Sequence, residues 1–230
     1  MRGTFVTGTD TGIGKTVVSS LVVAALRRFG PTGYWKPVQT GIEHDDDTEE
    51  VRRLASCGPG EIADFGIRLP RPLSPHLSAR LAGRSVAVQD LAVMSERLHH
   101  GRHWIVEGAG GILVPLNDRE TIADLVNRLK LPALVAARSG LGTINHTLLT
   151  ISELRRRSID VAGVAMVGEP NDENRKAIEL HGRTAVLAQV PVLDPLVPET
   201  IERHASRLSA GLRCLIPQEQ PQQQDRPASL

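Results

Sequence analysis

Short apolar runs alternate along this chain with longer segments whose apolar residues recur at helical spacing. Near-continuous apolar runs predict strands at residues 3–7, 33–38, 104–106, 134–137, 161–167 and 186–190. Apolar residues every three to four positions predict helices at residues 15–28, 48–55, 90–99, 122–128 and 145–157. Strands without polar alternation, separated by helices, indicate a parallel sheet that helices cover on both faces. The sequence therefore predicts an α/β fold.

Composition narrows the class of protein. The 230 residues suit one α/β domain, expected at residues 1–216, followed by a disordered Pro/Gln-rich tail at residues 217–230. The 27 basic and 26 acidic residues give a net charge of +1, and only 3% of residues are aromatic, so we expect no nucleic-acid partner. No apolar run reaches the ~20 residues of a membrane span, and the N-terminus does not have the form of a signal peptide. The two cysteines are too few for a disulfide framework or a four-ligand zinc site, which fits a reducing compartment, and we expect a soluble, cytoplasmic protein.

A glycine-rich turn connects the first predicted strand to the first predicted helix. Residues 4–16 read TFVTGTDTGIGKT. Such a loop directs backbone N–H groups at phosphate oxygens, and the helix after it presents its positive end to them. We expect Lys15 to reach the β- and γ-phosphates and Thr16 to join a Mg²⁺ shell. The usual spacing would put glycine at Thr9, so the motif is a variant; the alternative is a glycine-rich turn beside a surface lysine.

Two more candidates follow the second predicted strand, in the segment WKPVQTG and the acidic run after it. Ligands of open parallel sheets lie outside the carboxyl ends of the strands. The proline after Lys36 disfavours helix and would keep this ammonium at the rim of the sheet, although a solvated lysine is the alternative. In the run at residues 45–47, Asp47 is the preferred Mg²⁺ ligand and Asp46 the reserve, whereas the commoner role of such an aspartate is an N-cap.

A third loop at this rim begins in the segment HWIVEGAGGILVPL. Glu107 is predicted to be the last residue of the buried strand, placed to hold Mg²⁺ or a water bound to it. The glycines after it allow a ligand to approach the backbone closely. The alternative is a tight turn with an exposed glutamate.

The segment RSGLGTINHTLLT repeats the sequence of strand, glycines and helix. The predicted helix start at residues 143–145 offers free N–H groups, which form an anion site. No second Lys-Thr pair follows it, so we expect it to hold a carboxylate rather than another nucleotide phosphate.

Together these segments resemble one enzyme family. TGTDTGIGKT, WKPVQTG, PLSPHLSA, VEGAGG and GLGTINHT occur in the order and approximate spacing of the dethiobiotin synthetases, from about residue 3 to residue 212. The resemblance implies a single-domain P-loop NTPase-like protein, usually a homodimer, in biotin biosynthesis. Such an enzyme is an ATP-dependent ligase that closes the ureido ring of dethiobiotin from 7,8-diaminopelargonate, CO₂ and ATP with Mg²⁺.

The resemblance also implies residue roles. The resemblance marks Lys36 as catalytic, and we expect Lys36 and Lys15 to act as the catalytic pair that flanks a carbamate and the γ-phosphate. The implied metal ligands are Thr16, Asp47 and Glu107. Contacts to the diamine end fall to Thr11 and Thr40. The substrate carboxylate is expected to reach the helix start of the partner subunit, at Leu141, Gly142, Thr143 and Asn145.

Nucleotide contacts are predicted along the same rim. The expected set is Gly12, Ile13, Gly14, Lys15, Thr16, Val17, Asp47, Glu107, Gly108, Ala109, Gly110, Gly168, Glu169, Pro191, Val192 and Leu193. Two of these positions depart from the family pattern, which often has Glu at Gly12 and commonly an adenine-reading Asn at Gly168. The base preference is therefore open, with ATP as the default.

Two other functions fit a P-loop α/β chain. One is another amide- or ring-forming ATP enzyme of related fold, which the compact length and the WKPVQTG segment disfavour. The other is a non-enzymatic P-loop switch or partitioning ATPase. Such proteins generally carry an extra lysine early in the loop, and residues 9–11 contain none.

Overall fold

The protein is described by a computed structural model that covers residues 1–216 of the 230. The predicted disordered tail, residues 217–230, lies outside the described residues. Within residues 1–216, no helix combines the length and the apolar character needed to cross a membrane.

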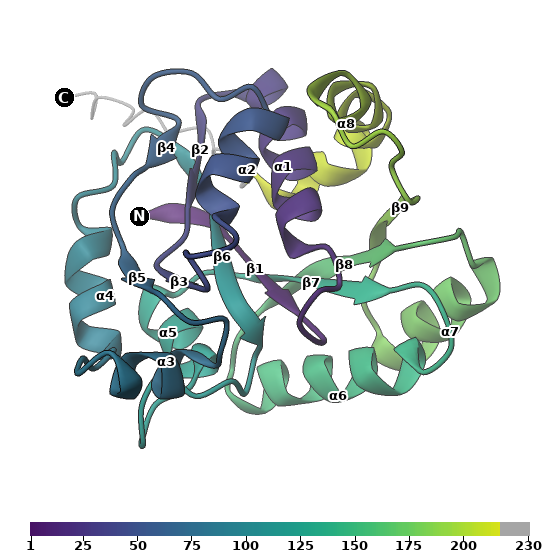
Figure 1. The fold of residues 1–230 in the computed structure, drawn as a ribbon. Helices are drawn as coiled ribbons and strands as arrows, with labels where there is room; N and C mark the ends of the chain where they lie inside the picture. The colour runs from purple at the N-terminus through teal and green to yellow at the C-terminus, as the bar shows by residue number, and fades with distance from the viewer. Residues whose placement is uncertain (217–230) are drawn as a thin grey trace, which may run out of the picture.

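Seven parallel strands form the central sheet, and two short parallel strands form a second one beside it (Figure 1). In spatial order the central strands are β4 (Ile62–Ala63), β2 (Thr32–Trp35), β6 (His103–Gly111), β1 (Arg2–Gly8), β7 (Ala133–Arg138), β8 (Val161–Val167) and β9 (Val186–Val190). The second sheet pairs β3 (Val38–Thr40) with β5 (Ile67–Leu69). The sheet confirms the predicted fold class.

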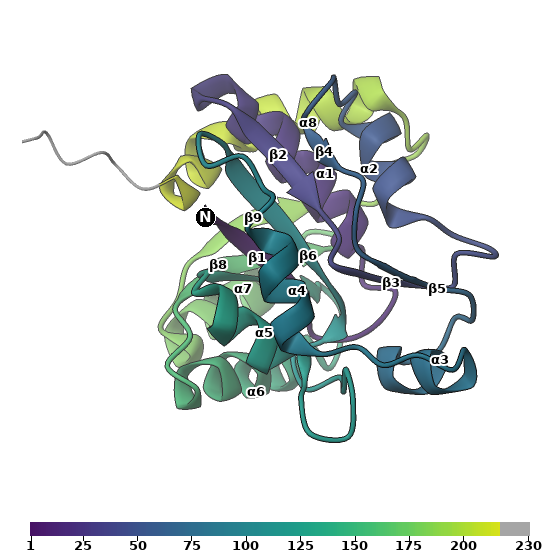
Figure 2. The ribbon, with the colours of Figure 1, turned by 90° about the vertical axis from the view of Figure 1, so that its left-hand side faces the viewer.

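Helices cover both faces of the central sheet (Figures 1 and 2). One face packs against α1 (Lys15–Leu26), α2 (Asp47–Leu54) and α8 (Pro198–Leu212). The other packs against α4 (Val88–Ser95), α5 (Ile122–Leu129), α6 (Thr143–Arg156) and α7 (Asp172–Gly182). The short helix α3 (Pro75–Leu81) packs against the second sheet instead. Successive strand residues pack into the cores on opposite faces of the sheet: Val6 packs on the face of α1 and α8, and Phe5 packs on the other face. This alternation explains why the strands are apolar without interruption.

Two predicted strands needed correction. The segment at residues 33–38 is not one strand, because β2 ends at Trp35 and β3 begins at Val38 in the other sheet. Pro37 has no N–H to donate to a ladder, so the chain changes sheets there. Glu107 does not end its strand either, because β6 continues to Gly111 beside β1.

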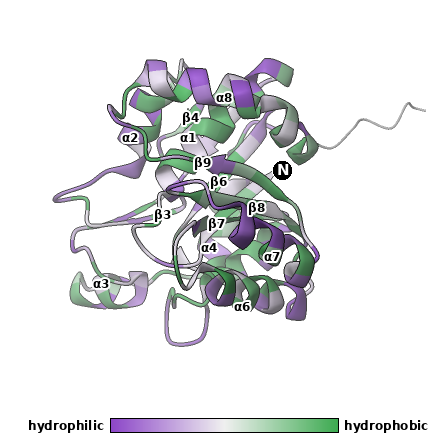
Figure 3. Cartoon of the chain, turned by 90° about the vertical axis from the view of Figure 1, so that its right-hand side faces the viewer, coloured by the Kyte–Doolittle hydropathy of each residue, from purple (hydrophilic) through white to green (hydrophobic). Residues whose placement is uncertain are grey.

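Several elements were absent from the sequence prediction: β4, β5, α3, α7 and α8, together with the 3₁₀ turns Arg27–Phe29 and Arg213–Leu215. The α4 helix also ends earlier than predicted, at Ser95 rather than residue 99. The α7 helix shows why periodicity failed. It buries only Ile178 and Gly182, and it is coloured mostly hydrophilic in Figure 3.

A buried histidine at the end of the sheet opposite the phosphate loop makes stability depend on pH. His103 Nε2 lies 3.0 Å from Thr4 Oγ1, and among the described residues its Nδ1 has no hydrogen-bond partner. Burial and the Arg2 charge lower the pKa of His103 from 6.5 to about 4. The folded state therefore holds this imidazole neutral at pH values where the unfolded chain protonates it.

We expect the free energy of unfolding to be unaffected by His103 above pH 6.5, where both states hold the imidazole neutral. Stability should fall as the pH drops from 6.5 to about 4, because the unfolded chain takes up the proton first. One pKa unit corresponds to ~1.4 kcal/mol, so about 3 kcal/mol of unfolding free energy is at stake. Urea unfolding at about pH 7.5 and about pH 4.5 should show a larger acid loss for the parent chain than for His103→Gln. Equal acid losses in the two proteins would contradict the prediction.

Candidate functional site

The phosphate loop has the backbone conformation that its glycines suggested. Gly12 and Gly14 have φ values of 68° and 92°, which residues with a Cβ rarely adopt. The α1 helix starts directly after Gly14, at Lys15. Lys15 is buried, and its Nζ folds back to donate to the carbonyl oxygen of Asp10 at 3.1 Å. The loop thus forms a backbone cradle at the N-terminus of a helix.

Lys36 lies between two carboxylates at the rim of the sheet. Its Nζ is 2.6 Å from Asp47 Oδ2 and 2.8 Å from Glu107 Oε1, and it also donates to the Gly108 carbonyl at 3.2 Å. Lys36 is 3% exposed and Glu107 1% exposed. The alternative interpretations, in which Lys36 is a solvated lysine and Glu107 an exposed turn residue, are therefore wrong.

Thr16 joins the same cluster from the first turn of α1. Its hydroxyl donates to Asp47 Oδ1 at 2.9 Å and lies 3.4 Å from Glu107 Oε1. Three segments far apart in sequence thus bring one hydroxyl and two carboxylates together. These are hard oxygen donors of the kind that suit Mg²⁺. Within residues 1–216, no group of three His, Cys, Asp or Glu side chains offers an alternative metal site.

Two residues that sequence analysis missed hold the other oxygen of Glu107. Ser19 Oγ donates to Oε2 at 2.7 Å, and the Tyr34 hydroxyl donates to the same atom at 3.2 Å. Ser19 is one helical turn from Thr16, and Tyr34 lies in β2, two residues before Lys36. Helical spacing places Ser19 on the same face of α1 as Thr16, but the contact of either residue with Glu107 depends on tertiary packing.

The electrostatics of the cluster keep Lys36 and Asp47 charged. Burial opposes the charged form of Lys36, but Glu107 and Asp47 outweigh it and raise the pKa of Lys36. For Asp47, burial is again outweighed, by the Lys36 charge and hydrogen bonds from Lys36 and Thr16, and its pKa is lowered. Burial and the Lys36 charge lower the pKa of Lys15. The two lysines therefore repel each other at a place suited to an anion.

The acidic run at residues 45–47 divides its roles. Asp46 is the N-cap of α2, with its Oδ1 accepting from the backbone N–H of Thr48 at 2.8 Å and of Glu49 at 3.4 Å. Asp47, the first helical residue, faces Thr16 and Lys36 instead. The N-cap interpretation thus holds for Asp46 and not for the preferred candidate.

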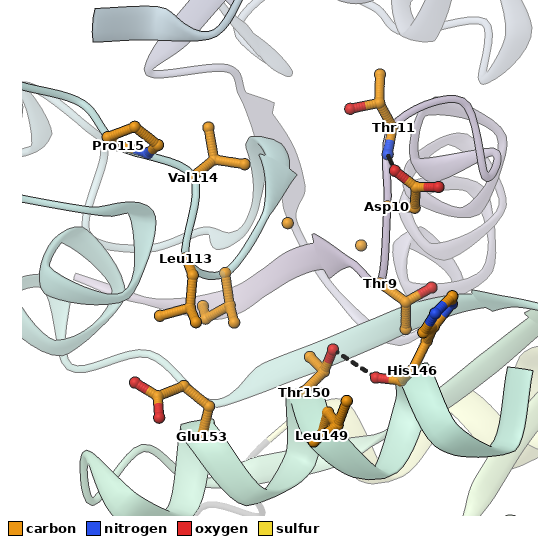
Figure 4. Close-up of a pocket in the computed structure, with 13 residues that line it drawn as sticks. Thr9, Asp10, Thr11, Leu113, Val114, Pro115, His146, Leu149, Thr150 and Glu153 are labelled. Atoms are coloured by element: carbon orange, nitrogen blue, oxygen red, sulfur yellow. Dashed lines mark hydrogen bonds between the residues drawn. The ribbon is translucent and has the colours of Figure 1, made fainter.

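A cavity of about 440 Å³ opens beside the phosphate loop (Figure 4). Thr9, Asp10 and Thr11 form one wall. The turn after β6 forms another, with the apolar side chains of Leu113, Val114 and Pro115. The α6 helix forms the floor with His146, Leu149, Thr150 and Glu153. Such a cavity suits a small molecule with polar groups at one end and an apolar body.

The predicted substrate contacts divide between this cavity and the surface. Thr11 lines the cavity, whereas Thr40 ends β3 and is not among the lining residues. The stretch at residues 141–145 precedes and begins α6, outside the cavity. Leu141 and Asn145 are exposed, and Thr143 is buried, with its hydroxyl 3.4 Å from that of Thr147. Sequence analysis missed the α6 residues that do line the cavity.

The remaining predicted nucleotide residues lie at neighbouring strand ends. Gly110 and Gly111 abut the phosphate loop, since a Cβ on Gly110 would lie 3.6 Å from Thr11 Oγ1 and one on Gly111 would lie 3.3 Å from the Gly8 carbonyl oxygen. A Cβ on Gly108 would instead lie 2.8 Å from the Phe5 ring. Val167, the last residue of β8, would be 3.1 Å from a Cβ on Gly14, so Gly168 follows beside the loop. A Cβ on Gly168 would approach Ser139 Oγ to 2.6 Å, and Gly168 has a φ of 123°, a conformation that residues with a Cβ rarely adopt. Pro191, Val192 and Leu193 follow β9 directly.

Comparisons with known proteins match most of the chain. A protein-family model described as an AAA domain matches residues 2–200. The ATP-dependent dethiobiotin synthetase BioD of Brucella ovis is 46% identical over 202 residues, which are 88% of this chain and 92% of that protein. The protein of the same name from Brucella abortus (strain 2308) is 45% identical with the same coverage.

Solved structures share the fold at low identity. A ParA family ATPase from Chlorobium tepidum has a TM-score of 0.57 at 7% identity, covering 91% of this chain and 98% of its own. A structure of the MinC:MinD cell division protein complex of Aquifex aeolicus has a TM-score of 0.57 at 14% identity. The match covers 96% of this chain and 99% of that chain. At these identities the likeness shows a P-loop ATPase fold and says nothing about a partitioning activity.

Proposed function

The chain belongs to the ATP-dependent dethiobiotin synthetase family, and from this premise we propose that it closes the ureido ring of dethiobiotin from 7,8-diaminopelargonate, CO₂ and ATP with Mg²⁺. Its relatives of that name make it an ATP-dependent ligase of biotin biosynthesis. The observation that supports the detailed reaction best is the convergence of Lys15, Lys36, Thr16, Asp47 and Glu107 beside an open cavity.

The reaction proceeds in three steps. One substrate amine takes up CO₂ as a carbamate and loses a proton. A carbamate oxygen then attacks the γ-phosphorus of ATP, so that ADP leaves and a carbamic–phosphoric anhydride forms. The second amine attacks the carbonyl carbon and loses a proton, phosphate leaves, and the ring closes. Phosphoryl transfer chiefly requires placement and charge stabilisation.

The residues of the cluster have separate tasks in this scheme. The phosphate-loop N–H groups and Lys15 hold the β- and γ-phosphates. Lys36, kept protonated by its two carboxylates, orients the carbamate oxygen toward the γ-phosphorus and stabilises the charge that develops there. Thr16, Asp47 and Glu107 would hold Mg²⁺, which would neutralise negative charge that develops on the phosphates. Backbone groups of Gly168, Glu169 and residues 191–193 would contact the base.

The cavity receives the diaminopelargonate. Its threonine-lined wall would take the amine end near Thr11, and Leu113, Val114 and Leu149 would contact the alkyl chain. We further propose a homodimer, supported by the exposed apolar side chains of Leu113, Leu141 and Leu149 on this side of the molecule. In it, the substrate carboxylate would reach the α6 start of the partner subunit.

The proposal is tested by incubating the purified chain with diaminopelargonate, bicarbonate and MgATP. We expect dethiobiotin by mass spectrometry, with one ADP and one phosphate released per product molecule. ATP hydrolysis that ignores the diamine but responds to DNA or to a protein partner would instead support a P-loop switch. Diamine-dependent hydrolysis without dethiobiotin would indicate another ligase of this fold.

Narrowing the cavity should weaken substrate binding selectively. Val114→Phe adds a ring to a lining position, and we expect it to raise the KM for diaminopelargonate about tenfold, equivalent to ~1.4 kcal/mol, with the KM for ATP unchanged. Val93→Phe is the matched control, because Val93 is half exposed on α4 and does not line the cavity. Steady-state kinetics measure both constants. An equal change in the two KM values would argue against this cavity as the diamine site.

A further inference from the structure

The backbone that carries Lys36 depends on an arginine outside the charged cluster. Lys36 and Pro37 lie between the two sheets, where neither belongs to a strand. Their carbonyl oxygens accept hydrogen bonds from β5: the backbone N–H of Ile67 donates to Pro37 O at 2.8 Å, and Arg68 Nη1 donates to Lys36 O at 3.0 Å. The side chain of Arg68 thus replaces the ladder partner that Lys36 lacks.

The same guanidinium holds the segment that carries Asp47. Arg68 Nη2 donates to Thr48 Oγ1 at 3.0 Å, and Thr48 follows Asp47 in the first turn of α2. The two N–H groups therefore span two segments whose side chains form the 2.6 Å pair between Lys36 and Asp47. A planar fork of donors with fixed spacing suits such a bridge, whereas an ammonium is a single point of contact.

The backbone just before β5 lies very close to Lys36 at Gly66. A Cβ on Gly66 would lie 2.6 Å from the Lys36 carbonyl oxygen and 2.9 Å from that of Pro37. Any other residue at this position would push the two segments apart. Glycine here therefore permits the approach that Arg68 completes.

We propose that Arg68 is a positioning residue that fixes the Lys36 backbone relative to the first turn of α2. Arg68 is not among the residues that line the cavity, and the hydrogen bonds described for its side chain run to Lys36 and Thr48. It sets the relative position of the ammonium assigned to the carbamate and the carboxylate assigned to Mg²⁺, so its role in turnover rests on the proposed function. Its effect on the Asp47 position does not.

The test uses the full chain with Arg68→Met, Arg68→Lys and the control Arg84→Met. Arg84 Nη1 donates to the Arg68 carbonyl at 3.1 Å, so it contacts the same strand without reaching Lys36 or Thr48. Two quantities are measured: dethiobiotin turnover, and the factor by which Mg²⁺ increases ATP affinity in the absence of diamine. The second requires no reaction and remains informative if the chain makes no dethiobiotin.

We expect Arg68→Met to lower kcat about tenfold or more and to reduce the Mg²⁺ effect on ATP affinity several-fold, with Mg²⁺-free affinity within about twofold of the parent. Arg68→Lys should restore less than half of either loss. Arg84→Met should stay within about twofold in both. Should Arg68→Met fail to fold, Thr48→Val removes one acceptor of the bridge at nearly constant volume and should still reduce the Mg²⁺ effect. Parental values in the Arg68 and Thr48 variants while Asp47→Asn reduces the Mg²⁺ effect, or an equal loss in Arg84→Met, would overturn the proposal. A parental Mg²⁺ effect in Asp47→Asn as well would instead contradict the metal assignment.

Discussion

Replacing Lys36 with alanine is expected to lower turnover about 10²–10³-fold while ATP affinity changes little, because the role proposed for Lys36 is on the carbamate and the transferring phosphoryl group rather than in nucleotide binding. In the structure, Lys15 opens α1 and its Nζ donates to the Asp10 carbonyl oxygen, whereas Lys36 follows β2 and pairs with Asp47 and Glu107. Single-turnover kinetics and ATP titration by calorimetry separate the two effects.

A control for charge balance accompanies this variant. Lys36→Ala leaves Asp47 and Glu107 without their shared cation, and breaking such a buried pair costs about 3–5 kcal/mol of unfolding free energy. Lys36→Arg keeps the positive charge but moves it, so it should recover stability and not turnover. Near-parental turnover in Lys36→Ala would reduce Lys36 to a structural counter-ion. Recovery of turnover by Lys36→Arg would show that charge matters and position does not.

The fold could be predicted from sequence because its main features are local. Apolar strands alternate with amphipathic helices, and the loop before Lys15 has glycines where the backbone needs positive φ. Elements that bury few apolar residues were not predicted. The α7 helix buries only Ile178 and Gly182, and the two residues of β4 leave no periodicity to detect.

The candidate cluster could be predicted only in part. The rule for ligands of parallel sheets selected the loops of Lys36, Asp47 and Glu107, which the structure brings together. The supporting contacts depend on tertiary packing, so no rule about a single segment could reveal that Tyr34 and Ser19 share one oxygen of Glu107. The cavity floor on α6 was missed for the same reason.

The metal assignment leads to the second large effect, an increase in the Mg²⁺ concentration needed for activity. Asp47 and Glu107 both have an oxygen within reach of the Thr16 hydroxyl, at 2.9 and 3.4 Å. Asp47→Asn and Glu107→Gln keep the size of each side chain and remove its charge. Each substitution should raise the Mg²⁺ concentration needed for activity about tenfold or more, because losing one contact to the ion weakens Mg²⁺ binding without abolishing nucleotide binding.

Coupling between the two changes decides whether the carboxylates share one ion. If they do, the double variant should cost less in free energy than the sum of the single changes, as for residues that act as a unit. The matched control is Asp46→Asn, one residue from Asp47, since asparagine caps helices as well as aspartate and the N-cap should survive. Its Mg²⁺ requirement should equal that of the parent. A higher Mg²⁺ requirement in Asp46→Asn with no change in Asp47→Asn would assign the metal to Asp46. Free-energy costs that add exactly in the double variant would show that Asp47 and Glu107 have separate roles.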